Sequence, residues 1–255
     1  MRLLPLLLGL SVLEGDGGWS AAAPLPEPIQ ELSAAVLHGK IYVAGGIDRT
    51  GQASAAAFRY DPAANHWERI AELPAPRHHM PLAVVGDTLY AVGGLAEPSF
   101  VPESTLWLYR EDRNQWEPRA PLPAPRGASG VGVVSGKLVV VGGWGAGRRL
   151  IAASAIYDPA TDRWSKRSAM PSRRGGLAAA VLDGAIHVVG GETRGSVFPN
   201  HEVYDPATDR WTTAPALPVA RHGLAAAAVG GKLYVIGGGP RPGFSQTDAV
   251  DVFAP

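Results

Sequence analysis

The chain has 255 residues, of which 46% are hydrophobic, and its 23 basic and 23 acidic side chains balance to a formal net charge of zero. Because this balance leaves no net field to attract a polyanion, neither nucleic acid nor an anionic membrane surface is expected as a partner. The absence of cysteine excludes disulfides, thiolate metal sites and a cysteine nucleophile. We expect no cofactor.

The chain opens with Met1-Arg2 and a mostly apolar run from Leu3 to Leu13. A positive charge followed by a short apolar run is typical of a secretory signal, and this run is too short to span a bilayer. We therefore predict a signal peptide or disordered leader over residues 1–18 and one domain over residues 19–255. The protein is then periplasmic or secreted, without membrane insertion. The alternative is an apolar leader on a cytoplasmic protein.

A unit of four short strands follows, and its pattern is clearest between Gly175 and Trp211. A run of small apolar residues leads into Asp183-Gly184, which is typical of a two-residue hairpin turn, and a second apolar run ends at a diglycine. After a loop, one strand ends in Tyr-Asp-Pro, where proline favours a turn, and the last strand carries the tryptophan. This pattern predicts strands and no helix.

The unit recurs along the chain at a period near 48 residues. The diglycines begin at Gly45, Gly93, Gly142, Gly190 and Gly237, and tryptophans with the same spacing stand at Trp19, Trp67, Trp116, Trp164 and Trp211. All the variation in length lies between each diglycine and the next tyrosine, at Tyr60, Tyr109, Tyr157 and Tyr204. A long period with a diglycine in each copy is typical of the blades of a β-propeller.

The diglycine after an apolar strand, followed by Tyr-Asp-Pro and Trp, resembles the kelch repeat over residues 19–255. The resemblance is to exported bacterial kelch proteins, and more distantly to the sialic-acid mutarotase and galactose-oxidase propellers. It implies an all-β propeller of four-stranded blades. Two departures stand out: Tyr109-Arg110-Glu111 replaces Tyr-Asp-Pro, and the chain supplies five repeats where kelch propellers usually have six or seven.

The N-terminal strand predicts how the ring closes. Residues 19–26 match residues 211–218, whereas Phe253-Ala254-Pro255 occupies the Tyr-Asp-Pro position of the last repeat with no tryptophan after it. We predict that the Trp19 strand completes the last blade, because closure removes exposed sheet edges. The result is a closed five-bladed monomer. The alternative is a sixth blade supplied by a dimer or a domain swap.

One end of the propeller is the candidate binding face. The loops between the second and third strands and the connections between blades share this end, and all the length variation lies there. We call it the loop face, and the opposite end, with its short stereotyped turns, the turn face. Loops on a rigid scaffold are where binding usually takes place.

Arginine recurs on the loop face where four blades enter their innermost strand, at Arg77, Arg126, Arg174 and Arg221. Four guanidinium groups around one channel mouth would favour a carboxylate, a phosphate or an acidic peptide. Arginines at similar places are used by kelch domains that bind acidic peptides. The alternative is that these entry arginines cap backbone carbonyls or pair with neighbouring acids.

Four further residues on the loop face are candidate ligand contacts. Trp144 could stack on a sugar ring or a partner side chain, or simply pack over the channel. Glu192 could act as a general acid or base, or pair with an arginine. His79 and His222 lie on the same face with His78, but their blades are not all adjacent and we predict no metal site.

These residues favour a non-catalytic binding propeller that holds an anionic group, either an acidic peptide or a carboxylated sugar. The alternative is a carbohydrate-active enzyme of the sialic-acid mutarotase or epimerase type, with Glu192 and His79 as acid and base. The copper radical oxidases among kelch proteins need a cysteine, which this chain lacks. A purely structural role in a larger complex also stays open, since fold resemblance alone does not decide function.

Overall fold

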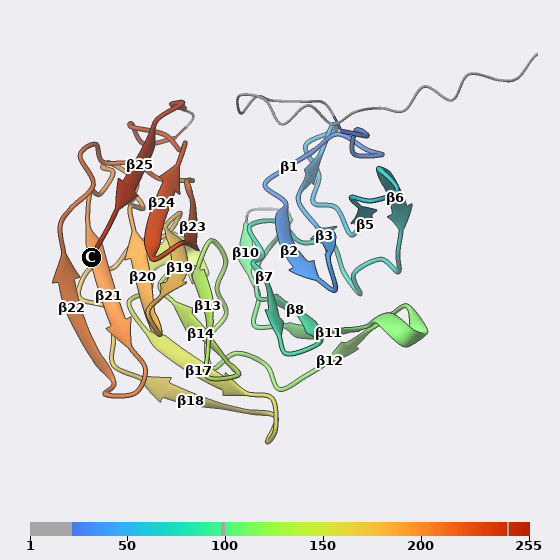
Figure 1. The fold of residues 1–255 in the computed structure, drawn as a ribbon, viewed down its shortest axis with the longest axis horizontal. Coiled ribbons are helices and arrows are strands. Elements are labelled where there is room, and N and C mark those ends of the chain that lie inside the picture. The colour runs from blue at the N-terminus through green and yellow to red at the C-terminus, as the bar shows by residue number, and fades with distance from the viewer. Residues whose placement is uncertain (1–21, 98–99, 244) are drawn as a thin grey trace, which may run out of the picture.

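The computed structural model describes residues 22–97, 100–243 and 245–255. The described strands form five consecutive β-sheets that follow one another as blades around an arc (Figure 1). The helical segments among them are two short 3-10 turns, Glu111–Arg113 and Ala146–Arg148, and no described helix is long and apolar enough to cross a membrane. The prediction of an all-β propeller with five blades is confirmed.

Each blade is an antiparallel meander that runs from the axis outward. Blade 1 contains β2 (Ser33–Leu37), β3 (Lys40–Ala44), β5 (Ala57–Asp61) and β6 (His66–Arg69). Blade 2 contains β7 (Leu82–Val85), β8 (Thr88–Val92), β11 (Leu106–Arg110) and β12 (Gln115–Pro118). Blade 3 contains β13 (Gly130–Val134), β14 (Lys137–Val141), β17 (Ser154–Asp158) and β18 (Arg163–Arg167). Blade 4 contains β19 (Ala178–Leu182), β20 (Ala185–Val189), β21 (His201–Asp205) and β22 (Arg210–Ala214). Blade 5 contains β23 (Ala225–Val229), β24 (Lys232–Ile236) and β25 (Val250–Phe253).

Short strand pairs brace the loop face. They are β1 (Ile29–Gln30) with β4 (Ile47–Asp48), β9 (Leu95–Ala96) with β10 (Val101–Pro102), and β15 (Trp144–Gly145) with β16 (Arg149–Leu150). On the turn face, the predicted hairpin turns are confirmed, because both residues of Asp183-Gly184 have positive φ, 51° and 76°.

In each of blades 1 to 4, a repeated polar clamp holds the segment that leads into that blade. In blade 4, Tyr204 stacks on Trp211 with ring centroids 5.0 Å apart and donates its hydroxyl to Asp209 Oδ1 at 2.7 Å. Asp209 also accepts the backbone N–H of Ser168, whose carbonyl accepts the indole N–H of Trp211. Equivalent clamps hold Ala23, Ala71 and Ala120. In blades 2 to 4 these tryptophans therefore link neighbouring blades.

The diglycines are explained by a close approach of backbone at each junction. Gly190 has φ of 63°, and a Cβ placed on it would lie 2.4 Å from the carbonyl oxygen of Arg221, which enters the next blade. The same carbonyl accepts a hydrogen bond from the N–H of Gly191 at 2.8 Å. Gly45 and Gly93 meet the carbonyls of Arg77 and Arg126 in the same way. A side chain at these positions would force the blades apart.

The described part of the ring is open between its last and first blades. Blade 5 has three described strands, and it lies across an opening from blade 1 (Figure 1). The strand predicted to complete blade 5 contains Trp19, which lies outside the described residues, as do residues 1–18 and the predicted start of the domain. Closure by this strand stays a prediction.

A candidate binding face

The four entry arginines lie inside the blades, where they bond to backbone and to acids. The exposed fractions of Arg77, Arg126, Arg174 and Arg221 are 7%, 1%, 0% and 0%. Arg126 Nη1 donates to the carbonyl oxygens of Gly142 and Ala153 at 3.2 and 2.7 Å, and Arg221 Nη1 donates to those of Gly237 and Ala249 at 3.1 and 2.9 Å. Arg126 and Arg221 therefore link the end of the second strand of their blade to the start of the third strand.

Three of the four entry arginines also meet an acid of their own blade. Arg174 Nη1 lies 2.6 Å from Glu202 Oε2, and both side chains are fully buried. Arg221 pairs with Asp251, and Arg77 Nη2 lies 3.6 Å from Glu103 Oε2. Arg126 bonds to carbonyls, and burial lowers its pKa to about 10. Of the two alternatives for the entry arginines, the geometry favours the one in which they cap carbonyls and pair with local acids. It does not favour an open mouth of four free guanidinium groups.

A belt of backbone hydrogen bonds runs part of the way around the axis at the loop face, from Gly223 to Glu31. Ala128 N donates to His79 O at 2.9 Å, Gly176 N to Ala128 O at 3.1 Å, and Gly223 N to Gly176 O at 2.8 Å, while His79 N donates to Glu31 O at 3.3 Å. These residues occupy equivalent positions in five repeats, and all have positive φ. In blades 1 and 2 the positions carry Glu31 and His79 in place of a small residue, which places polar groups beside the axis.

The two neighbouring histidines of blade 2 are uncharged at neutral pH. His78 Nδ1 lies 2.6 Å from His79 Nδ1, and His79 Nε2 lies 3.3 Å from Glu31 Oε2. The pKa of both rings is lowered to about 4, chiefly by burial, and at His79 the positive charge of Arg148 contributes to this shift. His79, which is half-buried, can offer a hydrogen bond to a ligand but no positive charge, whereas His78 is fully buried.

An aromatic and cationic shelf lies beside these histidines. The guanidinium carbon of Arg148 lies 4.6 Å from the ring centroid of Phe100 and 5.6 Å from that of Trp144. Trp144 lies flat on Gly175, where an added Cβ would come within 2.0 Å of the indole. Arg148 is exposed and Trp144 half-buried. We call Phe100, Trp144 and Arg148 the aromatic shelf.

Backbone strain separates this region from the rest of the loops. Twelve described non-glycine residues have positive φ, and seven of them belong to the hairpin and outer turns of the turn face. The other five lie on the loop face, at Glu31, His79, Phe100, Ala128 and Arg148. Such conformations cost energy in a folded protein, and they gather where a site must be held in one arrangement.

Glu192 and His222 form a separate pair between blades 4 and 5. His222 Nδ1 lies 3.5 Å from Glu192 Oε2, and His222 Nε2 donates to Arg241 O at 3.0 Å. Among the described ion pairs the partner of Glu192 is thus a histidine, and none of them joins it to an arginine. No described contact joins Glu192 to His79, and no cluster of described histidine and acidic residues could hold a metal ion.

Exposed arginines on the loop face were not singled out by the repeat pattern. They lie in four of the five variable loops, at Arg49, Arg148, Arg149, Arg194 and Arg241. Within the described ranges none of them forms an ion pair, whereas Glu31, Glu97, Glu103 and Glu192 each pair with a histidine or an entry arginine. The loops vary in length, so repeat alignment gives these arginines no common position.

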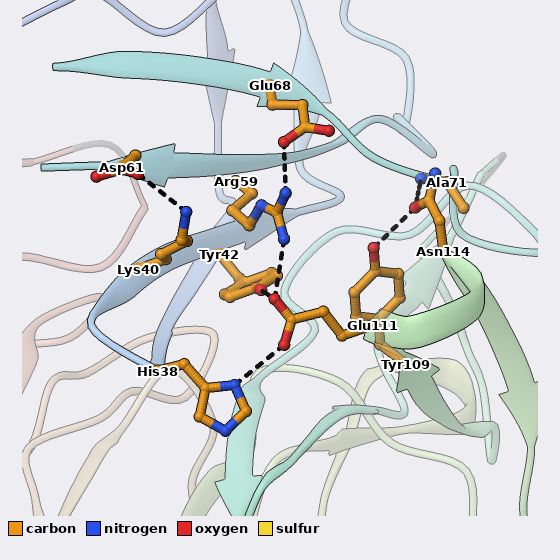
Figure 2. A network of polar contacts seen from close by, with 10 residues as sticks. All are labelled: His38, Lys40, Tyr42, Arg59, Asp61, Glu68, Ala71, Tyr109, Glu111 and Asn114. Atoms are coloured by element: carbon orange, nitrogen blue, oxygen red, sulfur yellow. Dashed lines mark hydrogen bonds and ion pairs between the residues drawn. The ribbon is translucent and has the colours of Figure 1, made fainter. Parts of the chain in front are cut away.

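A polar network that the repeat pattern does not predict lies on the turn face, at the departure from Tyr-Asp-Pro (Figure 2). Glu111 accepts hydrogen bonds from the Tyr42 hydroxyl at 2.6 Å and from Arg59 Nη1 at 2.9 Å, and it lies 3.0 Å from His38 Nδ1. These bonds lower the pKa of Glu111, and its contact raises the pKa of His38. The network links blade 1 to blade 2, and its polar groups are hydrogen-bonded to one another.

Repeated four-stranded blades around a common axis, with stapled interiors and variable loops at one end, define a β-propeller whose candidate binding face is the loop face. A family model described as the KLHDC2/KLHL20/DRC7 Kelch-repeats domain matches residues 18–167 and 117–239. The chain belongs to this kelch-repeat family, whose propeller fold fits a binding role.

Two individual proteins extend the comparison. Kelch-like protein 35 of Mus musculus is 33% identical over 54 residues, which are 21% of this chain and 9% of that protein. The chain therefore spans a small part of the length of that relative. The solved structure titled "Structure of YjhT" superposes with a TM-score of 0.84 over 94% of this chain and 86% of that chain. At 16% sequence identity this likeness supports the fold alone.

Proposed function

We propose that the protein is a binding module that holds a ligand bearing a carboxylate on its loop face, at the aromatic shelf. The observation that carries the proposal is the pairing of Arg148 with two aromatic rings, at 4.6 and 5.6 Å, and with no described acid. An exposed guanidinium can take a carboxylate in a bidentate contact, and a half-buried indole offers an apolar face for stacking.

The charge distribution of the loop face supports an anionic ligand. Five exposed arginines have no described acidic partner, whereas Glu103 pairs with the entry arginine Arg77 and the other described glutamates of the face lie beside histidines. A ligand that carries negative charge would therefore meet unpaired positive groups. The interior arginines would contribute by holding the loops in place, and not by contact with the ligand.

Two ligand classes fit this chemistry, a carboxylated sugar and an acidic peptide. Both present a carboxylate to Arg148, and both can lay an apolar surface on Trp144, either a sugar ring or an aliphatic stem. His79 beside the shelf is uncharged at neutral pH and can donate or accept one hydrogen bond. Catalysis by Glu192 and His79 gains no support, because they belong to different blades without a described contact.

Isothermal titration with a small panel tests the proposal. The probes are N-acetylneuraminate, galacturonate and a hexaglutamate peptide, with galactose as the neutral control. We expect binding of at least one anionic probe and none of galactose, and Arg148→Ala should weaken it about tenfold or more. The neighbouring exposed arginine gives the matched control, so Arg149→Ala should change affinity less than about threefold.

The outcomes are distinct. Affinity that falls with added salt and with Arg148→Ala supports the shelf, because exposed charge contacts are screened. Equal binding of galactose and galacturonate would contradict the requirement for a carboxylate. Binding that survives Arg148→Ala together with Trp144→Leu would place the ligand elsewhere.

A further inference from the structure

A row of four titratable side chains runs beside the aromatic shelf. His78 Nε2 lies 3.4 Å from Glu97 Oε1, and His79 Nε2 lies 3.3 Å from Glu31 Oε2. Between them, the two Nδ1 atoms of the histidines lie 2.6 Å apart. Each imidazole therefore faces a carboxylate with one ring nitrogen and the other imidazole with its second nitrogen.

The three contacts of this row need more protons than the two neutral histidines carry. Two ring nitrogens, or a ring nitrogen and a carboxylate oxygen, attract one another only when a hydrogen lies between them, because these atoms otherwise present lone pairs. A neutral imidazole carries a single N–H, so the two rings supply two hydrogens for three contacts. Whichever tautomers the rings adopt, at least one contact lacks its hydrogen, and one additional proton would complete the row.

The unpartnered nitrogen of His78 is consistent with this shortage. His78 is fully buried, and its Nε2 has no hydrogen-bond partner among the described residues although Glu97 lies close by. A buried polar atom without a partner is rare in folded proteins and costs free energy. A proton between His78 Nε2 and Glu97 Oε1 would give this nitrogen the hydrogen bond that it lacks.

The backbone holds the row in place at a cost in conformational strain. Glu31 and His79 have φ of 55° and 50°, in the left-handed region that few residues other than glycine adopt. The equivalent residues of the other three repeats are small, at Ala128, Gly176 and Gly223. Because His79 N donates to Glu31 O at 3.3 Å, the two polar side chains are brought next to each other. Strain of this kind gathers at functional sites.

Burial and one neighbouring cation oppose the additional proton. The pKa of both histidines is lowered to about 4, chiefly by burial, and the positive charge of Arg148 contributes to the shift at His79. Arg148 and the histidines meet at Phe100, whose ring centroid lies 4.9 Å from that of His78 and 4.6 Å from the guanidinium carbon. The two carboxylates of the row act in the opposite direction and raise the pKa of His78. At neutral pH the pair therefore stays uncharged.

A carboxylate bound at Arg148 would shift this balance. Under the proposed function, the negative charge of the ligand offsets the guanidinium whose field acts on His79. Loss of a nearby positive charge favours the protonated form of an imidazole, so the pKa of the pair rises when the ligand binds. By linkage, the ligand then binds more tightly to the protein whose pair is protonated.

We propose that the His78–His79 pair takes up one proton when a carboxylate binds at the aromatic shelf, so that the protein captures its ligand more tightly at acidic pH. This coupling rests on the proposed function and regulates the same site. The protonated pair donates one hydrogen to each carboxylate of the row and shares the third between the two Nδ1 atoms. A second proton is excluded, because it would place two N–H groups and two positive charges against each other across 2.6 Å.

Isothermal titration at two pH values tests the coupling. The probes are N-acetylneuraminate and galacturonate, whose carboxyl groups stay ionised at both pH 7.5 and pH 5.5. We expect the affinity to rise about threefold or more at pH 5.5, with uptake of up to one proton per ligand when buffers of different ionisation enthalpy are compared. His79→Asn should bind equally at both pH values, because asparagine tolerates the left-handed backbone but does not titrate. His222→Asn removes a histidine elsewhere on the loop face and should keep the wild-type ratio.

Proton NMR titration of the histidine rings tests the proton site without a ligand. Arg148→Ala should raise the pKa of the pair, because it removes the cation that a bound carboxylate would neutralise. Arg149→Ala, at the neighbouring exposed arginine, is the matched control and should raise it less.

The outcomes separate this proposal from the proposed function. Equal affinity of the wild type at both pH values would overturn the coupling and leave carboxylate binding intact. A pH dependence that His79→Asn retains would place the titrating group elsewhere and also overturn it. If neither probe binds at either pH, binding of a sugar acid fails and the NMR titration decides: an upward shift in Arg148→Ala supports the proton site, and an unchanged pKa contradicts it.

Discussion

Removal of the Arg174 side chain should lower the stability of the protein and leave its affinity for a ligand largely unchanged. Arg174 is fully buried, and its guanidinium donates to the carbonyls of Gly190 at 2.6 Å and Ser172 at 3.0 Å and to Glu202 at 2.6 Å. The Arg174→Ala change leaves a carboxylate that is 1% exposed without its cation. Breaking a buried pair from one side costs about 3–5 kcal/mol, a large part of the total stability of a domain.

Urea unfolding followed by tryptophan fluorescence measures this loss. Arg173→Ala is the matched control, because the Arg173 side chain is exposed. This substitution should change the unfolding free energy by less than about 0.5 kcal/mol. The double variant Arg174→Met/Glu202→Met should recover most of the loss, because a buried pair can be replaced by apolar groups of similar volume.

An Arg174→Ala protein that loses less than about 1 kcal/mol of stability and also loses its affinity for a carboxylate probe would contradict a buried structural role for this arginine. That result would mean that the guanidinium faces a ligand and not Glu202. The same test applies to Arg126 and Arg221, which the sequence pattern placed at an open mouth and which the structure buries.

Three further outcomes follow from the geometry. Gly190→Ala should cost about 2 kcal/mol more in urea unfolding than Gly184→Ala, because both have positive φ but only Gly190 faces a carbonyl at close range; equal costs would contradict this. The melting temperature should fall as pH drops from 6.5 towards 4, because burial lowers the pKa of His201 to about 4, as it does for His78 and His79, and the unfolded chain takes up these protons first; His201→Gln should remove part of this slope, and an unchanged slope would count against it. Glu111→Gln should lower stability at pH 7 by about 1 kcal/mol by loosening the clasp between blades 1 and 2, whereas the exposed Asp112→Asn should not; similar values for the two would dismiss the clasp.

The strands and junctions were predictable because they depend on spacing that repeats. The tryptophan seven residues after the third-strand tyrosine, and the diglycine 26 residues after that tryptophan, give the same pairing in blades 1 to 4, as in Tyr204 opposite Trp211. The clamp residues were also visible in principle, since asparagine or aspartate stands five residues after each tyrosine, as Asp209 does. Because the same residues recur at the same spacing, they have the same neighbours in each repeat, and the structure of one repeat predicts that of the others.

The candidate site was less predictable, because it depends on depth and on loops. The repeat spacing places Arg126 at the loop-face end of its blade. It does not tell whether the guanidinium is buried or exposed, which depends on its hydrogen bonds to the carbonyls of Gly142 and Ala153. The approach of Arg148 to Phe100 joins loops of two blades that share no length or register. Such contacts have no signature in a single sequence.

Hydrogen exchange with mass spectrometry, with and without a bound carboxylate probe, tests most directly that the loop face binds through its aromatic shelf. The account predicts that the ligand slows exchange in residues 95–105 and 144–153, and that Arg148→Ala abolishes this protection. Exchange around the buried entry arginines, in residues 124–134 and 172–182, should stay the same. Protection confined to those entry segments, or to the turn face, would contradict the account.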